Sequence, residues 1–116
     1  MEKTTEDCNF AAHRLRSAID VMLACDPAVR LESVLVFLSV CANEGLSIKD
    51  LVYACGLGES MISRTVDNLC QRELGGLLET ARHPTDGRRR LVYLTEAGRA
   101  VLAEITAILN KNAPEA

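Results

Sequence analysis

The 116-residue sequence predicts one mainly α-helical domain that contains a small β-hairpin and has helices flanking it at both ends. Two observations indicate this fold class. Apolar residues recur at helical spacing along most of the chain, and Gly or Pro interrupts these patterns. Two short strand-like runs, 77–82 and 90–94, enclose a loop that contains the turn dipeptide Asp86-Gly87.

The composition is typical of a folded domain. The chain is 48% hydrophobic and 25% charged, and only 3% aromatic, so Leu, Val, Ile and Ala are expected to form a helical core. No window approaches the roughly 18 uncharged apolar residues that indicate a membrane span. The N-terminal residues MEKTTEDCNF contain no apolar signal-peptide core. We therefore expect a cytoplasmic protein.

The cysteine pattern argues against a disulfide framework and against a zinc or other metal site. The count is odd and there is no C-x-x-C pair among Cys8, Cys25, Cys41, Cys55 and Cys70. All except Cys8 lie in apolar stretches and are expected to be small buried side chains. Cys8 lies near the start of the first helix, which suggests a redox-sensitive thiol. An incidental exposed thiol is the alternative.

Two helices are expected first, over 9–25 and 31–44. The stripe of the first helix comprises Ala11, Leu15, Ala18, Ile19 and Met22. Asp26-Pro27 ends this helix. The second is apolar on nearly every side, as in a helix buried in the middle of a domain, and Gly45 ends it.

A pair of shorter helices follows, joined by the turn 56–58. Ser47 and Asp50 resemble a capping box at the start of the first. The second covers about 59–73, and its inner face comprises Ile62, Val66, Leu69 and Cys70. Its polar outer face comprises Ser60, Met61, Ser63, Arg64, Asn68 and Gln71. This pattern is typical of a helix-turn-helix, although an ordinary helical corner has the same pattern.

The hairpin is followed by a final helix over about 96–111, with Thr95 as its N-cap. The order helix, helix, helix-turn-helix, hairpin, helix predicts a winged helix-turn-helix with flanking terminal helices. In this fold the second helix of the pair can enter the major groove of DNA while the hairpin contacts the adjacent backbone or minor groove. The hairpin loop carries the arginines expected there, Arg88, Arg89 and Arg90.

The formal net charge of −3 does not exclude DNA binding, because the local field at the binding face matters more. Residues 64–90 contain six arginines and four acidic residues, a local sum of +2. A merely solvated arginine loop is the alternative to a binding site.

Two segments resemble the MarR family of bacterial transcriptional regulators. LSIKDLVYACGLGESMISRTVDNLCQREL is similar to its helix-turn-helix, and DGRRRLVYLTEAGRAVL to its wing and the next helix. The matching motifs are Asp86-x-Arg88 and Leu94-Thr95-x-x-Gly98, and the similarity covers about 31–104.

The resemblance implies specific roles. Arg88 would enter the minor groove, and Asp86 would brace the wing through ion pairs with nearby arginines. The matching recognition-helix residues are Ser60, Met61, Ser63 and Arg64. The family is usually homodimeric through its terminal helices, and many members release DNA on binding a phenolic ligand or on cysteine oxidation.

The chain departs from this family at three points. Gly58 stands where a capping Ser is common, Glu59 places an acid beside the DNA face, and one helix follows the wing instead of two. We therefore identify a short variant. It is a single domain, with 46–94 as helix-turn-helix and wing, and 1–30 and 95–116 as flanking dimerisation segments.

The sequence thus predicts a homodimeric repressor that binds a palindromic operator in double-stranded DNA. The expected contact residues are Ser60, Met61, Ser63, Arg64, Asn68, Arg88, Arg89 and Arg90. A protein-binding winged helix, such as an antirepressor or assembly factor, is the alternative, supported by Glu59 and the low net charge. No cofactor is expected and an enzyme is disfavoured, because the chain has no nucleophile–base motif and the Gly56-x-Gly58 segment is too short to bind a dinucleotide.

Overall fold

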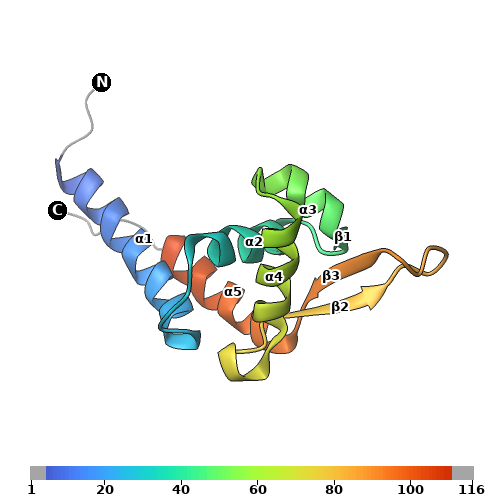
Figure 1. The fold of residues 1–116 in the computed structure, drawn as a ribbon. Helices are drawn as coiled ribbons and strands as arrows, with labels where there is room; N and C mark the ends of the chain where they lie inside the picture. Colours follow the sequence, from blue (N-terminus) through green and yellow to red (C-terminus); the bar gives the residue numbers. More distant parts are fainter. Residues whose placement is uncertain (1–4, 111–116) are drawn as a thin grey trace.

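The computed structural model describes residues 5–110 and confirms the predicted winged helix-turn-helix (Figure 1). The elements are, in order, α1 (Thr5–Cys25), α2 (Leu31–Ala42), β1 (Leu46–Ser47), α3 (Ile48–Cys55), α4 (Glu59–Cys70), a 3-10 turn (Arg72–Leu74), β2 (Leu78–Arg82), β3 (Arg90–Leu94) and α5 (Glu96–Leu109). No helix in this part of the chain is both long and apolar enough to cross a membrane.

The wing is a three-stranded antiparallel sheet in the order β1-β3-β2. The predicted hairpin pairs Leu78 with Leu94 and Arg82 with Arg90. The sequence did not predict β1, which pairs Leu46 with Val92 along the other edge of β3. A two-residue strand has no periodicity, so its pairing depends on where α2 and α3 place it.

The core lies where α2, α3 and α4 meet the base of the wing. Its largest fully buried side chains are Phe37, Leu51, Ile62, Leu77 and Leu78, together with Val36, Val40, Val66 and Val92. Phe37 is the buried aromatic residue in this cluster; the others are aliphatic apart from Met22. The prediction of an aliphatic helical core is therefore confirmed.

α1 packs against α5 to form an arm on the opposite side of the molecule from the wing tip (Figure 1). Ala18 and Met22 of α1 and Val101 and Ile105 of α5 are buried. At the C-terminus of α5, the Arg14 guanidinium donates a hydrogen bond of 2.8 Å to the Leu109 carbonyl. A cation at this end of a helix also interacts favourably with the helix dipole.

α1 begins at Thr5, before the predicted start at residue 9, and two further helix predictions need correction. α2 ends at Ala42 and is not buried on every side: Leu31, Leu35 and Leu38 are 78%, 49% and 42% exposed. The reason is that α3, α4 and the wing cover only its opposite face. α4 ends at Cys70, because Gln71 is extended and a 3-10 turn follows.

Candidate nucleic-acid interface

The position of α4 is fixed by the helix and turn that precede it. The Ser47 hydroxyl accepts from the Asp50 N–H at 3.1 Å, and the Ser47 N–H donates to the Asp50 carboxylate at 3.0 Å, so the predicted capping box is present. The Ser47 backbone N–H and then the Ser47 hydroxyl lower the pKa of the Asp50 carboxyl. Gly56 then ends α3 in the left-handed conformation, with φ of 68°, which glycine adopts without steric cost.

α4 separates an apolar inner face from a polar outer face. Ile62, Val66 and Leu69 are buried as predicted. The candidate contact residues on the outer side are exposed except for Ser63, which is half-buried: Ser60, Met61, Ser63, Arg64 and Asn68. The structure therefore brings the predicted recognition-helix residues together on one helix.

The wing loop is organised by its own hydrogen bonds. The Nδ1 atom of His83 accepts from the N–H groups of Thr85 at 3.2 Å and Asp86 at 3.1 Å, so the imidazole of His83 holds the turn. This geometry needs an unprotonated Nδ1. The Arg82 guanidinium donates to the Gly87 carbonyl at 2.8 Å from the neighbouring strand.

Asp86 stabilises the wing tip through the backbone. Its carboxylate accepts a hydrogen bond of 3.2 Å from the Arg88 N–H. Among the side chains that the structure describes, Arg90 pairs with Asp67 and Arg99 with Glu44, and neither pair includes Asp86. The role of Asp86 in bracing the wing through ion pairs with arginines stays a prediction.

A groove of about 660 Å³ lies between the wing and α4. Its charged lining residues are Lys49, Glu59, Asp86, Arg88, Arg89 and Arg90, four cations against two acids. Arg90 also pairs with Asp67 of α4 at 2.8 Å, which links the wing to the helix. Lys49 was not among the predicted residues. Its position two residues after the N-cap Ser47 could have indicated a solvent-exposed cation beside the turn.

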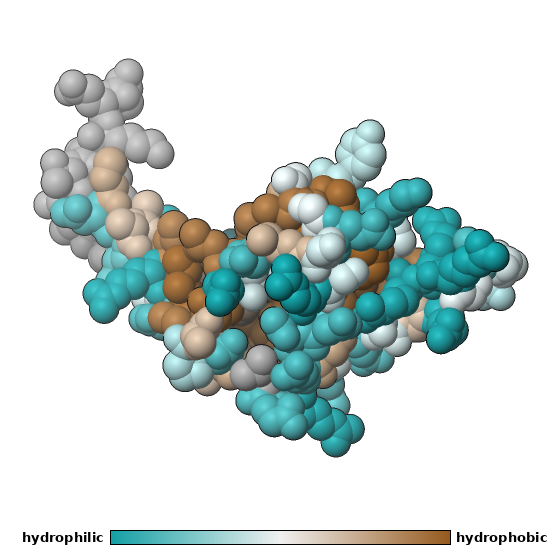
Figure 2. All heavy atoms as spheres, in the orientation of Figure 1, coloured by the Kyte–Doolittle hydropathy of each residue, from teal (hydrophilic) through white to brown (hydrophobic). Residues whose placement is uncertain are grey.

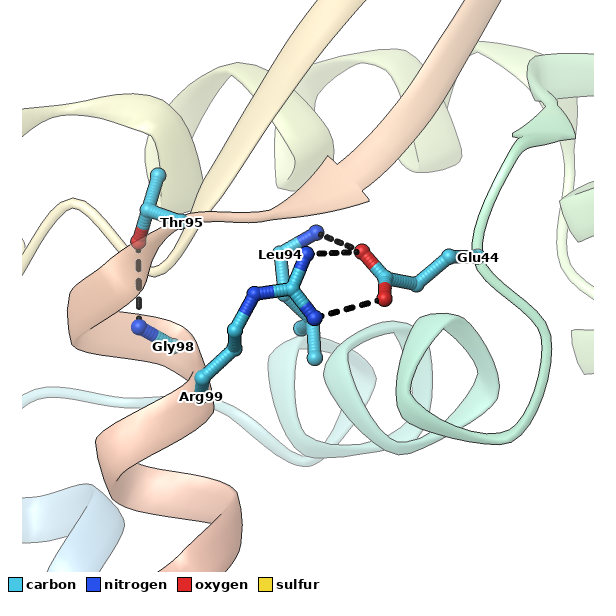
Figure 3. A network of polar contacts seen from close by, with 5 residues as sticks. All are labelled: Glu44, Leu94, Thr95, Gly98 and Arg99. Atoms are coloured by element: carbon cyan, nitrogen blue, oxygen red, sulfur yellow. Dashed lines mark hydrogen bonds and ion pairs between the residues drawn. The ribbon is translucent and has the colours of Figure 1, made fainter.

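The base of the wing is joined to α2 and α5 through Glu44 (Figure 3). One Glu44 oxygen accepts from the Leu94 N–H at 2.9 Å, and the Arg99 guanidinium binds both oxygens at 2.8 and 3.0 Å. The Arg99 hydrogen bonds, then the Leu94 N–H, lower the pKa of Glu44. Beside them, the Thr95 hydroxyl accepts from the Gly98 N–H at 3.0 Å, confirming the predicted N-cap.

Glu44→Gln is expected to lower the melting temperature at neutral pH, and Glu44→Ala to lower it further. Gln keeps an acceptor for the Leu94 N–H but loses the charge that pairs with Arg99, whereas Ala loses both. A carboxyl whose pKa is lowered by folding stabilises the protein above its unfolded pKa, and this contribution disappears as pH falls through the folded pKa.

The difference between wild type and Glu44→Gln should therefore shrink as the pH is lowered below about 4. Thermal unfolding of the three proteins followed by circular dichroism between neutral and acidic pH measures this trend. A difference that stays constant with pH would show that the Glu44 charge is not the cause.

The four cysteines expected to be buried are only partly buried, and Cys8 is more exposed than they are. Cys25, Cys41, Cys55 and Cys70 are half-buried, and Cys8 is exposed on α1. Burial raises the pKa of the thiols of Cys25 and Cys70, and that of Cys41 to about 11. High thiol pKa values disfavour the reactive thiolate. Redox sensing at Cys8 stays a prediction.

No protein-family model and no curated protein matches the sequence. Solved structures match the fold. BpsR from Bordetella bronchiseptica, whose DNA binding is regulated by 6-hydroxynicotinic acid, is 25% identical, with a TM-score of 0.60 over 84% of this chain and 76% of its own. The PcaV transcriptional regulator from Streptomyces coelicolor, solved with its natural ligand, is 28% identical, with a TM-score of 0.59 over 84% and 73%.

MepR from S. aureus, solved as a DNA complex, shares the fold with a TM-score of 0.70, at 22% identity over 85% of this chain and 78% of its own. These structural neighbours are MarR-family transcriptional regulators, as the sequence motifs suggested. The winged helix of this chain, its turn and its wing are therefore those of the MarR fold.

Proposed function

We propose that this chain, which has the fold of the MarR-family transcriptional regulators, binds a palindromic operator in double-stranded DNA as a homodimer and represses transcription. The observation that carries the proposal is the groove between α4 and the wing, where Lys49 and the arginines 88–90 lie beside the polar side of α4. MarR-family regulators are DNA-binding proteins without enzymatic activity, which supports the same assignment.

The proposed contacts follow from the sizes of the helix and the DNA groove. An α-helix with side chains is about 10–12 Å wide and the major groove of B-DNA is about 12 Å wide, so α4 can fill it. Arg64 would then reach base edges, with Ser60, Met61, Ser63 and Asn68 around it. Arg88 at the wing tip would reach the adjacent minor groove, with Arg89 and Arg90 near the backbone.

Exposed apolar residues on the arm support the homodimer. Leu15, Ile19 and Leu23 recur on α1 and are 57%, 37% and 38% exposed, and Leu109 of α5 is 42% exposed. Figure 2 shows hydrophobic residues gathered over the arm and α2, in contrast to the hydrophilic wing. Large exposed apolar surfaces mark interfaces, so we assign dimerisation to the segments 1–30 and 95–116. A two-fold axis would place the recognition helices about one DNA turn apart.

A small-molecule effector is part of the proposal. BpsR responds to 6-hydroxynicotinic acid, and CouR from Rhodococcus jostii, 26% identical to this chain, was solved with p-coumaroyl-CoA. These relatives support control of DNA binding by a ligand.

A protein-binding winged helix is the second candidate, because the exposed Glu59 lies at the start of α4 and lines the wing groove. Its carboxylate would repel a phosphate that approached this end of the helix. Selection of bound sites from a random DNA library distinguishes the two functions. An enriched palindrome, together with a dimeric mass by light scattering at micromolar protein, would support the repressor. The absence of enrichment and of salt-dependent DNA binding would favour the protein-binding function.

A further inference from the structure

A second groove, of about 220 Å³, runs along α4 on the side away from the wing groove. Its lining residues are Arg30, Glu32 and Ser33 at the start of α2, and Met61, Arg64, Thr65 and Asn68 of α4. Arg30 immediately precedes α2 and is exposed, and its side chain makes no capping hydrogen bond to the helix. Arg30, at the N-cap of α2, and Arg64 of α4 therefore line this groove together with one acid, Glu32.

The helical spacing of α4 shows that the two grooves lie on different sides of it. Successive residues of an α-helix project about 100° apart. Glu59 and Ser63, which line the wing groove, therefore point in nearly the same direction. Met61 and Asn68, which line the second groove, point roughly opposite to them. Arg64 lies between these directions, on the side that faces away from the buried Ile62.

We infer that Arg30 is a further DNA-contact residue, which binds a backbone phosphate on the flank of α4 opposite the wing. The inference rests on the proposed function, with α4 in the major groove. A helix that fills this groove has a phosphate backbone on each flank. Lys49 and the wing arginines lie on the flank of α4 that faces the wing. On the opposite flank, Arg30 is the cation from outside α4 that lines the second groove.

Arg30 would position the protein on DNA without reading sequence. A guanidinium is well suited to this role, because its planar donors match two phosphate oxygens. Contacts of this kind set the register of a recognition helix, whereas contacts to base edges specify the sequence. Arg30 would therefore hold α4 from the side while Arg64, in the same groove, reaches the bases.

The salt dependence of DNA binding tests the inference. Each phosphate contact contributes about 0.9 to the slope of log affinity against log salt. Arg30→Ala and Arg30→Gln should each reduce the slope by about this amount per protomer. For each tenfold change in salt, the affinity of the variant should therefore change by a factor about eight times smaller than that of the wild type. The loss of affinity in these two variants should be similar on selected and on mixed DNA. Arg30→Lys should keep most of the slope, because the charge remains.

Arg16→Ala is the matched control. Arg16 is exposed on α1 and lines neither groove, so the variant removes the same charge away from the DNA interface. Because Arg16 lies in the segment assigned to dimerisation, the slopes are compared at a protein concentration where light scattering shows both proteins to be dimers. The slope of Arg16→Ala should equal that of the wild type. Melting curves of Arg30→Ala and Arg30→Gln should match the wild type, since the backbone carbonyl of Arg30, which accepts from the N–H groups of Ser33 and Val34, is unchanged.

The outcomes separate the two proposals. A wild-type protein without salt-dependent DNA binding would overturn the proposed function and the inference with it. Steep salt dependence that is unchanged in Arg30→Ala and Arg30→Gln would overturn the inference alone. An equal loss of slope in Arg16→Ala would also overturn it, because the effect would then come from net charge.

Discussion

Arg88→Ala is expected to weaken DNA binding by about 1–3 kcal/mol for each protomer, and by up to about twice that in a dimer that uses both wings. The side chain is exposed at the wing tip. The wing should keep its conformation, because the hydrogen bond to the Asp86 carboxylate comes from the Arg88 backbone N–H, which Ala retains. Fluorescence anisotropy titrations at several salt concentrations, with melting curves for both proteins, measure affinity and folding separately.

Comparing the loss of affinity on different DNA sequences shows whether Arg88 contacts a base edge or a phosphate. A contact to a base edge would give a larger loss on the selected operator than on mixed DNA. A phosphate contact would give similar losses on both and reduce the salt slope by about one. Arg64→Ala on α4 is the informative comparison, because it should change the preferred sequence. Unchanged affinity of Arg88→Ala at low salt would remove Arg88 from the interface.

The elements that the sequence predicted well are those with local signals. Ser47 and Thr95 cap the helices they were expected to cap, Gly56 adopts a left-handed conformation in the predicted turn, and the Asp86-Gly87 loop joins β2 and β3 as expected. Each of these signals acts between residues a few positions apart. The outer face of α4 was predictable for the same reason, since its helical period separates buried from exposed positions.

The features that the sequence missed depend on contacts between distant segments. Arg30 lies more than 30 positions before Arg64, and only the packing of α2 on α4 places both along one groove. The Glu44 contacts with Leu94 and Arg99 span 50 and 55 positions. β1 has two residues and forms only because β3 offers it an edge. No period or cap in the sequence marks such contacts.

Gly98 belongs to the motif Leu94-Thr95-x-x-Gly98, which was visible in the sequence. The sequence did not show why this position needs a glycine. Gly98 is buried in the first turn of α5 and has no positive φ, so backbone freedom does not explain it. A Cβ at this position would overlap the backbone carbonyl oxygen of Leu77. That carbonyl also accepts the Thr95 N–H at 3.1 Å, which fixes the corner between the wing and α5.

Gly98→Ala is therefore expected to destabilise the fold, although Ala is the better helix former. The exchange gains about 1 kcal/mol of helix propensity. Overpacking a core costs about 1–3 kcal/mol and more where the backbone must move, and here the obstacle is a hydrogen-bonded carbonyl. We expect a net loss of about 2 kcal/mol or more in the free energy of unfolding, measured by urea titration. Gly87→Ala is the control: its added Cβ has no atom within 4 Å, and its stability should stay within about 0.5 kcal/mol of wild type. If Gly98→Ala were as stable as Gly87→Ala, the contact between α5 and the Leu77 carbonyl could not be the reason for glycine in this motif.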